Sequence, residues 1–199
     1  MNFDWTDQQQ KLRDDLSALF DDDTLSALDS LQSARPDEIR VTVLQTLARL
    51  APTGYLSAGV GPDGVADTVR LVAGQETVAN ANGDLFLAAE ASVRLFATLV
   101  AAHGGDAVKS ALLEPLQVGK LLGAVGLADG ASEDGAEVGL TATREGDKIR
   151  LNGRKGFLTN GPIADWVAVS ADLDGRTVVG LLKTDTKGYI RGPRMDTLG

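Results

Sequence analysis

The chain has 199 residues, of which 43% are hydrophobic and 24% charged, as is ordinary for a folded protein with one large domain or two small ones. It contains no cysteine and one histidine, which excludes a disulfide framework and a thiolate metal site. The formal net charge of −9 argues against general binding to nucleic acids or to anionic membranes.

The start of the chain, MNFDWTDQQQKLRDD, is acidic and polar, unlike a signal peptide. No apolar run in the sequence approaches the roughly 18 residues of a membrane span. Both features, with the lack of cysteine, predict a cytoplasmic protein without a membrane span.

Charge is unevenly distributed between the two parts of the chain. Residues 1–120 hold 9 basic and 17 acidic residues, whereas residues 121–199 hold 10 basic and 11 acidic ones. The residue pattern changes from helical to strand-like near the same point. We therefore expect a boundary near residue 120, between two parts that pack closely because no Gly/Ser-rich or Pro-rich linker separates them.

The first helix is expected to begin after Thr6, because Thr6 and Gln9 have the spacing of a capping box. Apolar residues then recur at helical spacing: Leu12, Leu16, Leu19 and Phe20. The acidic triplet Asp21–Asp23 should end this helix, since acidic groups oppose the helix dipole at a C-terminus. A calcium site is the alternative for the triplet, but a solvated stop followed by an N-cap is favoured.

Four further helices are predicted before residue 120. Pro36, Asp37 and Glu38 suit the first turn of a helix whose buried stripe runs to Leu50. A loop over residues 51–64 and a helix over residues 65–78 follow. Asp84 is expected to cap a long helix that Gly104 and Gly105 end, and a short helix over residues 106–113 is closed by Pro115.

After residue 120 the apolar period becomes two, which predicts short strands in a small barrel or sandwich. The expected strands cover residues 122–127, 138–143, 149–151, 166–171 and 177–182. Turns are expected at Glu145–Asp147 and at Asp172–Gly175.

Three features suggest chemistry but have simpler interpretations. Residues 59–64 match G-x-G-x-x-G, yet a helix is expected before them where a dinucleotide site needs a strand, so a loop is favoured. His103, the single histidine, suits a helix C-terminus and has no nucleophile motif near it. The clusters needed for a carboxylate-bound metal are absent.

Basic residues gather in the second part of the chain and could receive a phosphorylated ligand. Solvated strand edges, where cations discourage pairing with another chain, are the favoured explanation. The residues concerned are Arg144, Lys148, Arg150, Arg154 and Lys155.

Four stretches, taken in chain order, resemble the acyl-CoA dehydrogenase family, the flavoproteins that desaturate acyl-CoA thioesters. The opening FDWTDQQQKLRDDLSALF is similar to the family's first helix, and EPLQVGKLLGAVGLAD to the passage into its first strand. The most specific stretch, TATREGDKIRLNGRKGFLTNGPIADWVAVSA, carries the patterns L-N-G-x-K and T-N-G-x-x-A-D. The end, GLLKTDTKGYIRGPRMDTLG, resembles the following strand and linker.

The family fold has an N-terminal α-helical domain, a middle β-domain and a C-terminal four-helix bundle. The resemblance thus implies an α+β chain, with a helical domain over residues 1–120 and an incomplete middle β-domain, a small barrel or sandwich, over residues 121–199. The bundle is expected to be absent. Because most family members take their catalytic glutamate from the bundle, no residue here inherits that role.

FAD is the cofactor that the resemblance implies, with two segments along it. Leu127 and Ala128 occupy the first two positions of the family loop L-T-E-P-G-A-G-S-D, although Ala128 lacks the threonine hydroxyl. Phe157, Leu158 and Thr159 form the expected second flavin strand. In it, Phe157 stands beside the ring and Thr159 donates toward flavin N5. A plain core aromatic is the alternative for Phe157.

The same loop implies contacts with the acyl-CoA substrate. The serine that usually meets CoA is either replaced by Glu133 or shifted to Ser132, and a carboxylate there would oppose the CoA phosphates. This departure from the family pattern bears on whether the chain binds acyl-CoA as family members do.

Two functions remain open. The first is the N-terminal portion of an FAD-dependent acyl-CoA dehydrogenase of fatty acid metabolism, inactive as the isolated chain. An electron-transfer flavoprotein would then serve the complete enzyme, and a homo-oligomer or a related subunit is a further partner. The second is a non-catalytic or divergent subunit that binds a related subunit or acyl-CoA without chemistry. The altered loop favours the second function, and the intact T-N-G segment favours the first.

Overall fold

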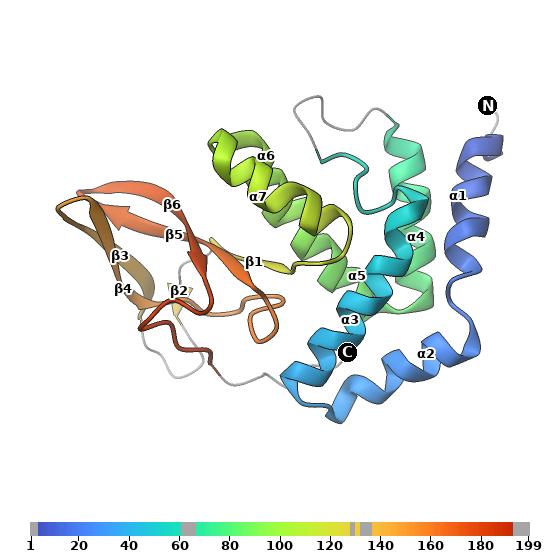
Figure 1. Ribbon diagram of the computed structural model, residues 1–199, viewed down its shortest axis with the longest axis horizontal. Coiled ribbons are helices and arrows are strands. Elements are labelled where there is room, and N and C mark those ends of the chain that lie inside the picture. Colours follow the sequence, from blue (N-terminus) through green and yellow to red (C-terminus); the bar gives the residue numbers. More distant parts are fainter. Residues whose placement is uncertain (1–3, 61–66, 128–129, 132–136, 193–199) are drawn as a thin grey trace.

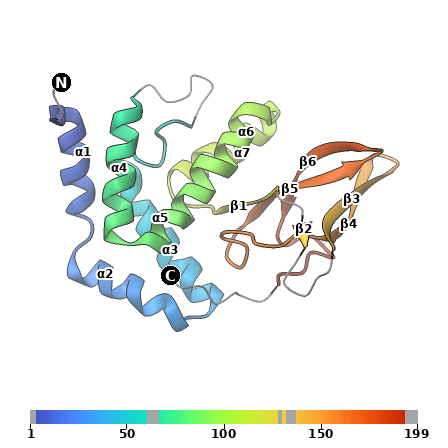
Figure 2. The same cartoon turned by 180° about the vertical axis from the view of Figure 1, so that it is seen from behind.

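The computed structural model describes residues 4–60, 67–127, 130–131 and 137–192. Helices form one end of an elongated molecule and strands the other, with β1 (Gly123–Gly126) leading from the helices into the sheet (Figure 1). The view from behind shows the same separation (Figure 2). The predicted α+β class, with helices first and strands second, is confirmed.

The first four helices begin at caps that the sequence contains. They are α1 (Asp7–Ser17), α2 (Asp22–Asp29), α3 (Pro36–Leu50) and α4 (Thr68–Ala81), with 3₁₀ turns at Ser30–Ser33 and Ala51–Thr53. The capping box before α1 is present, since the Thr6 amide donates to Gln9 Oε1 at 3.0 Å and the Gln9 amide to Thr6 Oγ1 at 3.4 Å. Asp21 caps α2 by accepting from the Thr24 amide at 2.8 Å, which confirms the N-cap, but α1 already ends at Ser17, so the acidic triplet does not end it.

The long central helix begins earlier than predicted. Its parts are α5 (Gly83–Ala89), a π-helical segment (Glu90–Phe96) and α6 (Ala97–His103). The N-cap is Asn82, whose side chain accepts from the Leu85 amide at 2.8 Å, so the assignment of this role to Asp84 was wrong. Asn82 has the extended backbone of an N-cap, and Asp84 lies in the first turn, where its charge suits the helix dipole.

The central helix also corrects the expectation that nothing in the chain is long and apolar enough to span a membrane. Residues 83–103 pass that test by length and composition, with a mean hydropathy of 1.7 in the most apolar window. The core helix of a soluble protein passes it too, and 56% of this window is buried within the fold. The π-helical segment packs on β1, so this helix is the core element that joins helices to sheet.

One of two predicted helix ends is confirmed, because α6 ends at His103, directly before Gly104, and the end predicted at Pro115 is wrong. Gly104 is extended, with φ −68°, and is needed for space: a Cβ there would lie 2.6 Å from the carbonyl oxygen of Val100. The next helix, α7 (Asp106–Gln117), continues past Pro115, which lies in its last turn. The Val118 amide still bonds to the Glu114 carbonyl at 3.0 Å, so the missing proline N–H does not end the helix.

The strands form one open sheet. They are β1, β2 (Gly130–Ala131), β3 (Glu137–Glu145), β4 (Lys148–Arg154), β5 (Trp166–Leu173) and β6 (Arg176–Lys183). Strand β5 pairs with β6 along one edge, while β1 and then β3 pair with its other edge. Strands β3–β4 and β5–β6 are antiparallel hairpins. Within the described residues the sheet does not close into a barrel.

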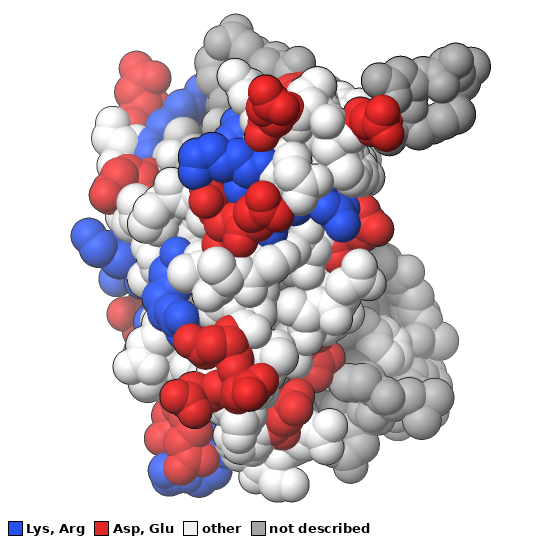
Figure 3. All heavy atoms as spheres, turned by 90° about the vertical axis from the view of Figure 1, so that its right-hand side faces the viewer, with Lys and Arg blue, Asp and Glu red and all other residues white. Residues whose placement is uncertain are grey.

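Buried apolar residues form three clusters that follow the chain from helices to sheet. The largest lies among α1, α3, α4 and the central helix. A second joins α6 and α7 to the sheet through Phe96, and a third lies around Val167 in the sheet. The surface of the helical end carries many Asp and Glu side chains, with Lys and Arg between them, in keeping with the negative net charge (Figure 3).

Candidate functional site

The segment expected to be a second flavin strand is not a strand. Residues 155–158 have no regular structure and residues 159–163 form turns, between the end of β4 and the start of β5. The reason lies in the backbone: Phe157 and Asn160 have φ values of +35° and +65°, which the extended strand conformation excludes. The segment is therefore a connection, whose side chains can point in directions that a strand does not allow.

Phe157 is the most unusual residue of this connection. Its ring is 64% exposed, so the alternative that it is a core aromatic does not hold in this structure. A left-handed backbone is uncommon for a bulky residue and costs roughly 1–2 kcal/mol. A large apolar side chain held on the surface at that cost suggests a surface that a ligand covers.

The end of β1 lies beside this connection. A Cβ on Gly126 would be 3.2 Å from Leu158 Cγ, so the Leu158 side chain packs inward over the last residue of β1. The Ser170 hydroxyl donates to the Leu127 carbonyl at 2.9 Å and accepts from Lys155 Nζ at 2.6 Å. Leu127, 41% exposed, and the connection are thus held together, and Thr159 is exposed as well.

Asn160 anchors the connection in the interior. Its side-chain Nδ2 donates to the carbonyl of Ala88 at 2.8 Å and to that of Gly123 at 3.1 Å, and the residue is 8% exposed. One amide group therefore ties the connection to the central helix and to β1. Asparagine suits the position because it tolerates a left-handed backbone better than most residues.

Asp165 joins the helices to the sheet a few residues later. Its Oδ1 accepts from the guanidinium of Arg40, on α3, at 2.7 Å, and its Oδ2 accepts from the Leu122 amide at 2.9 Å. The Asp165 backbone also bonds to Leu122 and to Thr184. Asn160 and Asp165 of the T-N-G-x-x-A-D pattern thus hold the fold together, which leaves Thr159 as its exposed member, with Phe157 exposed two residues before it.

Sequence reasoning assigned no role to Asn160, Asp165 or a further buried group around Glu90. The Glu90 carboxylate accepts from the Tyr55 hydroxyl and from Gln75 Nε2, each at 2.7 Å, while Arg94 bonds to the carbonyls of Leu56 and Tyr55. Burial, and then the nearby charge of Glu90, raise the pKa of Tyr55 above its usual range. The only sequence signal for this group was the helical spacing of Glu90 and Arg94.

Several predicted site residues cannot be placed. Ala128, proposed beside the flavin, and Ser132 and Glu133, proposed near acyl-CoA, lie outside the described residues. Gly61–Gly64 of the G-x-G-x-x-G match lie outside them as well. These assignments stay predictions.

The remaining candidates have ordinary surroundings. His103 is the last residue of α6, as expected. Arg150 pairs with Glu145 across the β3–β4 hairpin, with Arg150 Nη2 2.9 Å from Glu145 Oε2, and both are exposed. No group of three or more His, Asp or Glu side chains suited to a metal ion occurs in the part of the chain that the structure describes.

Together, the exposed residues offer a chemically simple surface. Leu127 and Phe157 are apolar and exposed, and Thr159, two residues after Phe157, adds an exposed hydroxyl. A planar aromatic ligand with hydrogen-bond acceptors at its edge fits such a surface, since the ring of Phe157 can cover one face and a hydroxyl can donate to the edge. The residues present therefore fit a flavin.

No family model matches the chain. Among curated proteins, the "Probable acyl-CoA dehydrogenase YngJ" of Bacillus subtilis is 28% identical to it over the whole chain and 54% of that protein. A short-chain specific acyl-CoA dehydrogenase of Megasphaera elsdenii is 33% identical over 71% of the chain and 38% of that protein. The chain thus spans about half, or less, of the length of these relatives.

The fold has solved counterparts. The acyl-CoA dehydrogenase of Bacillus anthracis, complexed with FAD, matches with a TM-score of 0.81 over 98% of this chain and 35% of that one, at 22% identity. At this identity the structural match shows the fold alone, whereas the relationship in sequence rests on the curated relatives.

Proposed function

The chain is related to the acyl-CoA dehydrogenases in sequence and in fold, and from this we propose that it forms the flavin-facing part of an FAD-dependent oxidoreductase that desaturates an acyl-CoA thioester. The observation that carries the proposal is the exposed, left-handed Phe157 beside Thr159 and the end of β1. These are the positions that the family resemblance assigns to the flavin.

The chain's own residues would bind and orient the cofactor. FAD, when bound, supplies the acceptor for the hydride that leaves the acyl β-carbon. Phe157 and Leu127 would cover apolar ring surface and exclude water from it, and the Thr159 hydroxyl would donate a hydrogen bond to a ring nitrogen. Leu158, packed inward on Gly126, would support the segment. Ser132 and Glu133 remain the residues proposed to meet acyl-CoA.

Partners follow from the same proposal. Acyl-CoA would be the substrate, an electron-transfer flavoprotein would accept the electrons of the complete enzyme, and a second copy or a related subunit would share the assembly. None of the described residues is proposed as the base, because the family resemblance assigns that group to the C-terminal bundle.

A second function, that of a non-catalytic subunit that binds a relative or acyl-CoA, is favoured by one feature. Residues 127–134 depart from the family loop: alanine replaces the threonine at position 128, the proline is missing, and Glu133, if it takes the place of the family serine, would oppose the CoA phosphates. Purification of the native protein from its cells separates the two functions, because the subunit would co-purify with a flavin-bearing relative and carry no flavin itself.

We expect the 199-residue chain by itself to hold flavin weakly and to show no acyl-CoA dehydrogenase turnover. Phe157 is 64% exposed, so the surface covers a ligand from one side only and buries too little area for tight binding. Absorbance near the flavin bands after gel filtration, and an assay with an artificial electron acceptor, measure both expectations. A stoichiometric flavin spectrum, or turnover that survives removal of contaminating enzymes, would contradict them.

In the flavin-bound form, Thr159→Val should lower flavin affinity by about five- to 150-fold. It preserves the side-chain shape and deletes the donor, and the loss of a hydrogen bond to a buried polar group costs roughly 1–3 kcal/mol. Thr177→Val, at an exposed threonine of β6, is the matched control and should leave the affinity unchanged. Fluorescence titration with FAD measures both, and equal affinities for the two variants would refute the assignment of Thr159.

Phe157→Asn should separate function from stability at the neighbouring position. Asparagine tolerates the left-handed backbone, so the melting temperature should hold or rise, while flavin affinity should fall through the lost ring contact. If Phe157 served the core instead, the same variant would lower the melting temperature and leave flavin binding intact.

A further inference from the structure

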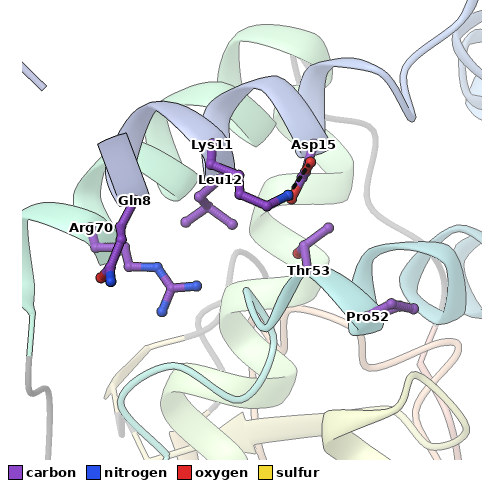
Figure 4. A pocket seen from close by; sticks show the side chains of 7 residues that line it. All are labelled: Gln8, Lys11, Leu12, Asp15, Pro52, Thr53 and Arg70. Carbon is purple, nitrogen blue, oxygen red and sulfur yellow. Dashed lines mark hydrogen bonds and ion pairs between the residues drawn. The ribbon is translucent and has the colours of Figure 1, made fainter. Parts of the chain in front are cut away.

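A hollow of about 430 Å³ lies between α1, the turn at Ala51–Thr53 and the start of α4, among the helices and away from the flavin-facing residues. Figure 4 shows its lining side chains, with Lys11 and Asp15 on α1 above it and the Arg70 guanidinium pointing into it from α4. The full lining is Gln8, Lys11, Leu12, Asp15, Pro52, Thr53 and Arg70. Its volume is in the range of small-ligand sites.

Arg70 is the unusual member of this lining. Its Nε is buried without a hydrogen-bond partner, and the guanidinium forms no ion pair within the described residues. Arg13, near it on α1, is by contrast paired with Glu76 at 2.8 Å. A half-buried guanidinium without an acceptor is costly, and although the chain has a net charge of −9, no carboxylate in the described part of the chain pairs with this guanidinium.

The other polar groups of the hollow leave one positive charge in excess. Lys11 is paired with Asp15, with 2.7 Å between Nζ and Oδ2, so these two charges offset each other. The Thr53 hydroxyl already donates to the Leu50 carbonyl at 2.8 Å. Gln8 is exposed and brings an amide donor to the rim. A ligand with a charge of −1 and oxygen acceptors would neutralise the excess positive charge and accept hydrogen bonds from Arg70.

Apolar surface lies opposite the charge. Leu12 lines the floor but is only 3% exposed, so the apolar surface open to a ligand is mainly the exposed Pro52 ring at the edge. A hydrated inorganic anion would gain nothing from such surface, whereas an alkyl tail would gain roughly 25 cal/mol for each Å² that it buries.

We propose that this hollow binds a short-chain carboxylate, whose oxygens accept from Arg70 and whose alkyl tail lies on the exposed Pro52 ring. A guanidinium binds a carboxylate with two parallel hydrogen bonds, which the two terminal nitrogens of Arg70 would donate. The site uses none of the residues of the proposed flavin surface, so each of the two proposals can fail without the other.

Calorimetric titration of the 199-residue chain with butyrate, acetate and phosphate at constant ionic strength tests the proposal. Butyrate should bind saturably and at least about threefold more tightly than acetate, because its longer tail reaches the Pro52 ring. Phosphate should bind more weakly than butyrate. Absence of saturable butyrate binding, equal affinity for acetate, or tighter binding of phosphate would overturn the assignment.

Variants make the test specific to the hollow. Arg70→Gln should weaken butyrate binding at least about tenfold. Arg70→Lys keeps the positive charge but not the two parallel donors of the guanidinium, so its butyrate affinity should lie between those of the parent and of Arg70→Gln. Arg176→Gln, an equal charge change at the exposed start of β6, is the matched control and should bind as the parent does. Asp15→Asn should strengthen binding a few-fold, since it removes the nearby carboxylate and releases Lys11.

Circular dichroism confirms that each variant is folded before titration. Arg70→Gln removes a buried group that lacks a partner, so the fold should tolerate it. Parent-like butyrate affinity in folded Arg70→Gln, or weaker binding in Asp15→Asn, would refute the role of Arg70.

Discussion

Gly119→Ala should lower the free energy of unfolding by about 3 kcal/mol or more. Gly119 lies between α7 and β1 with a φ of +69°, where an alanine costs roughly 1–2 kcal/mol. A Cβ there would also lie 2.5 Å from the backbone nitrogen of Ala48 and 2.6 Å from the carbonyl carbon of Leu47. Because these are backbone atoms of α3, relief requires movement of a whole helix, and overpacking of this kind adds roughly 1–3 kcal/mol.

Gly146→Ala separates the two causes. Gly146, in the β3–β4 turn, has a φ of +64° but nothing within 4 Å of the position of a Cβ. Its replacement should therefore cost only the roughly 1–2 kcal/mol of the left-handed backbone. Urea unfolding of both variants measures the difference, and equal losses would show that the approach of Gly119 to α3 does not matter.

Asn160→Ala should cost about 3 kcal/mol, the second large effect. It removes two side-chain hydrogen bonds, leaves the buried carbonyls of Ala88 and Gly123 without these donors, and puts alanine at a φ of +65°. Asn160→Gly keeps the left-handed backbone accessible and should cost less, about 2 kcal/mol, which isolates the hydrogen bonds. Chemical denaturation measures both.

Asn152→Ala is the matched control for Asn160. Asn152 is an exposed residue of β4, and its replacement should change the free energy of unfolding by less than about 0.5 kcal/mol. If Asn160→Ala were equally mild, the connection would be held by the packing of Leu158 and not by the Asn160 amide.

Local features of this protein were readable from the sequence because neighbouring residues decide them. The Thr6–Gln9 capping box, the Asp21 cap and the Pro36 helix start all depend on hydrogen bonds or dihedral angles within one turn of chain. The β5–β6 hairpin is similar, since Asp174 and Gly175 have the positive φ values that a tight turn requires. The resemblance to acyl-CoA dehydrogenases was visible for a related reason, as its most specific motif is a continuous stretch of chain.

At other positions the sequence allowed two local structures about equally well, and only the folded structure shows which one forms. Asn82 and Asp84 are both good N-cap residues two positions apart, and only the extended backbone of Asn82 identifies the true cap. Pro115 suggested a helix end, but later hydrogen bonds carry α7 two residues further. The long central helix was predicted as far as its end at His103, but no local pattern indicated the π-helical segment that continues α5 into α6.

The arrangement of the candidate site was decided by tertiary structure alone. Asn160 bonds to Ala88, 72 positions away, and Asp165 to Arg40, 125 positions away, and no local pattern encodes contacts of such separation. Sequence similarity marked Phe157 and Thr159 as candidates, yet it made their segment a strand. In the folded chain the Asn160 side chain is buried and Leu158 packs on Gly126. These two contacts leave Phe157 exposed, with a positive φ that is uncommon for a bulky residue.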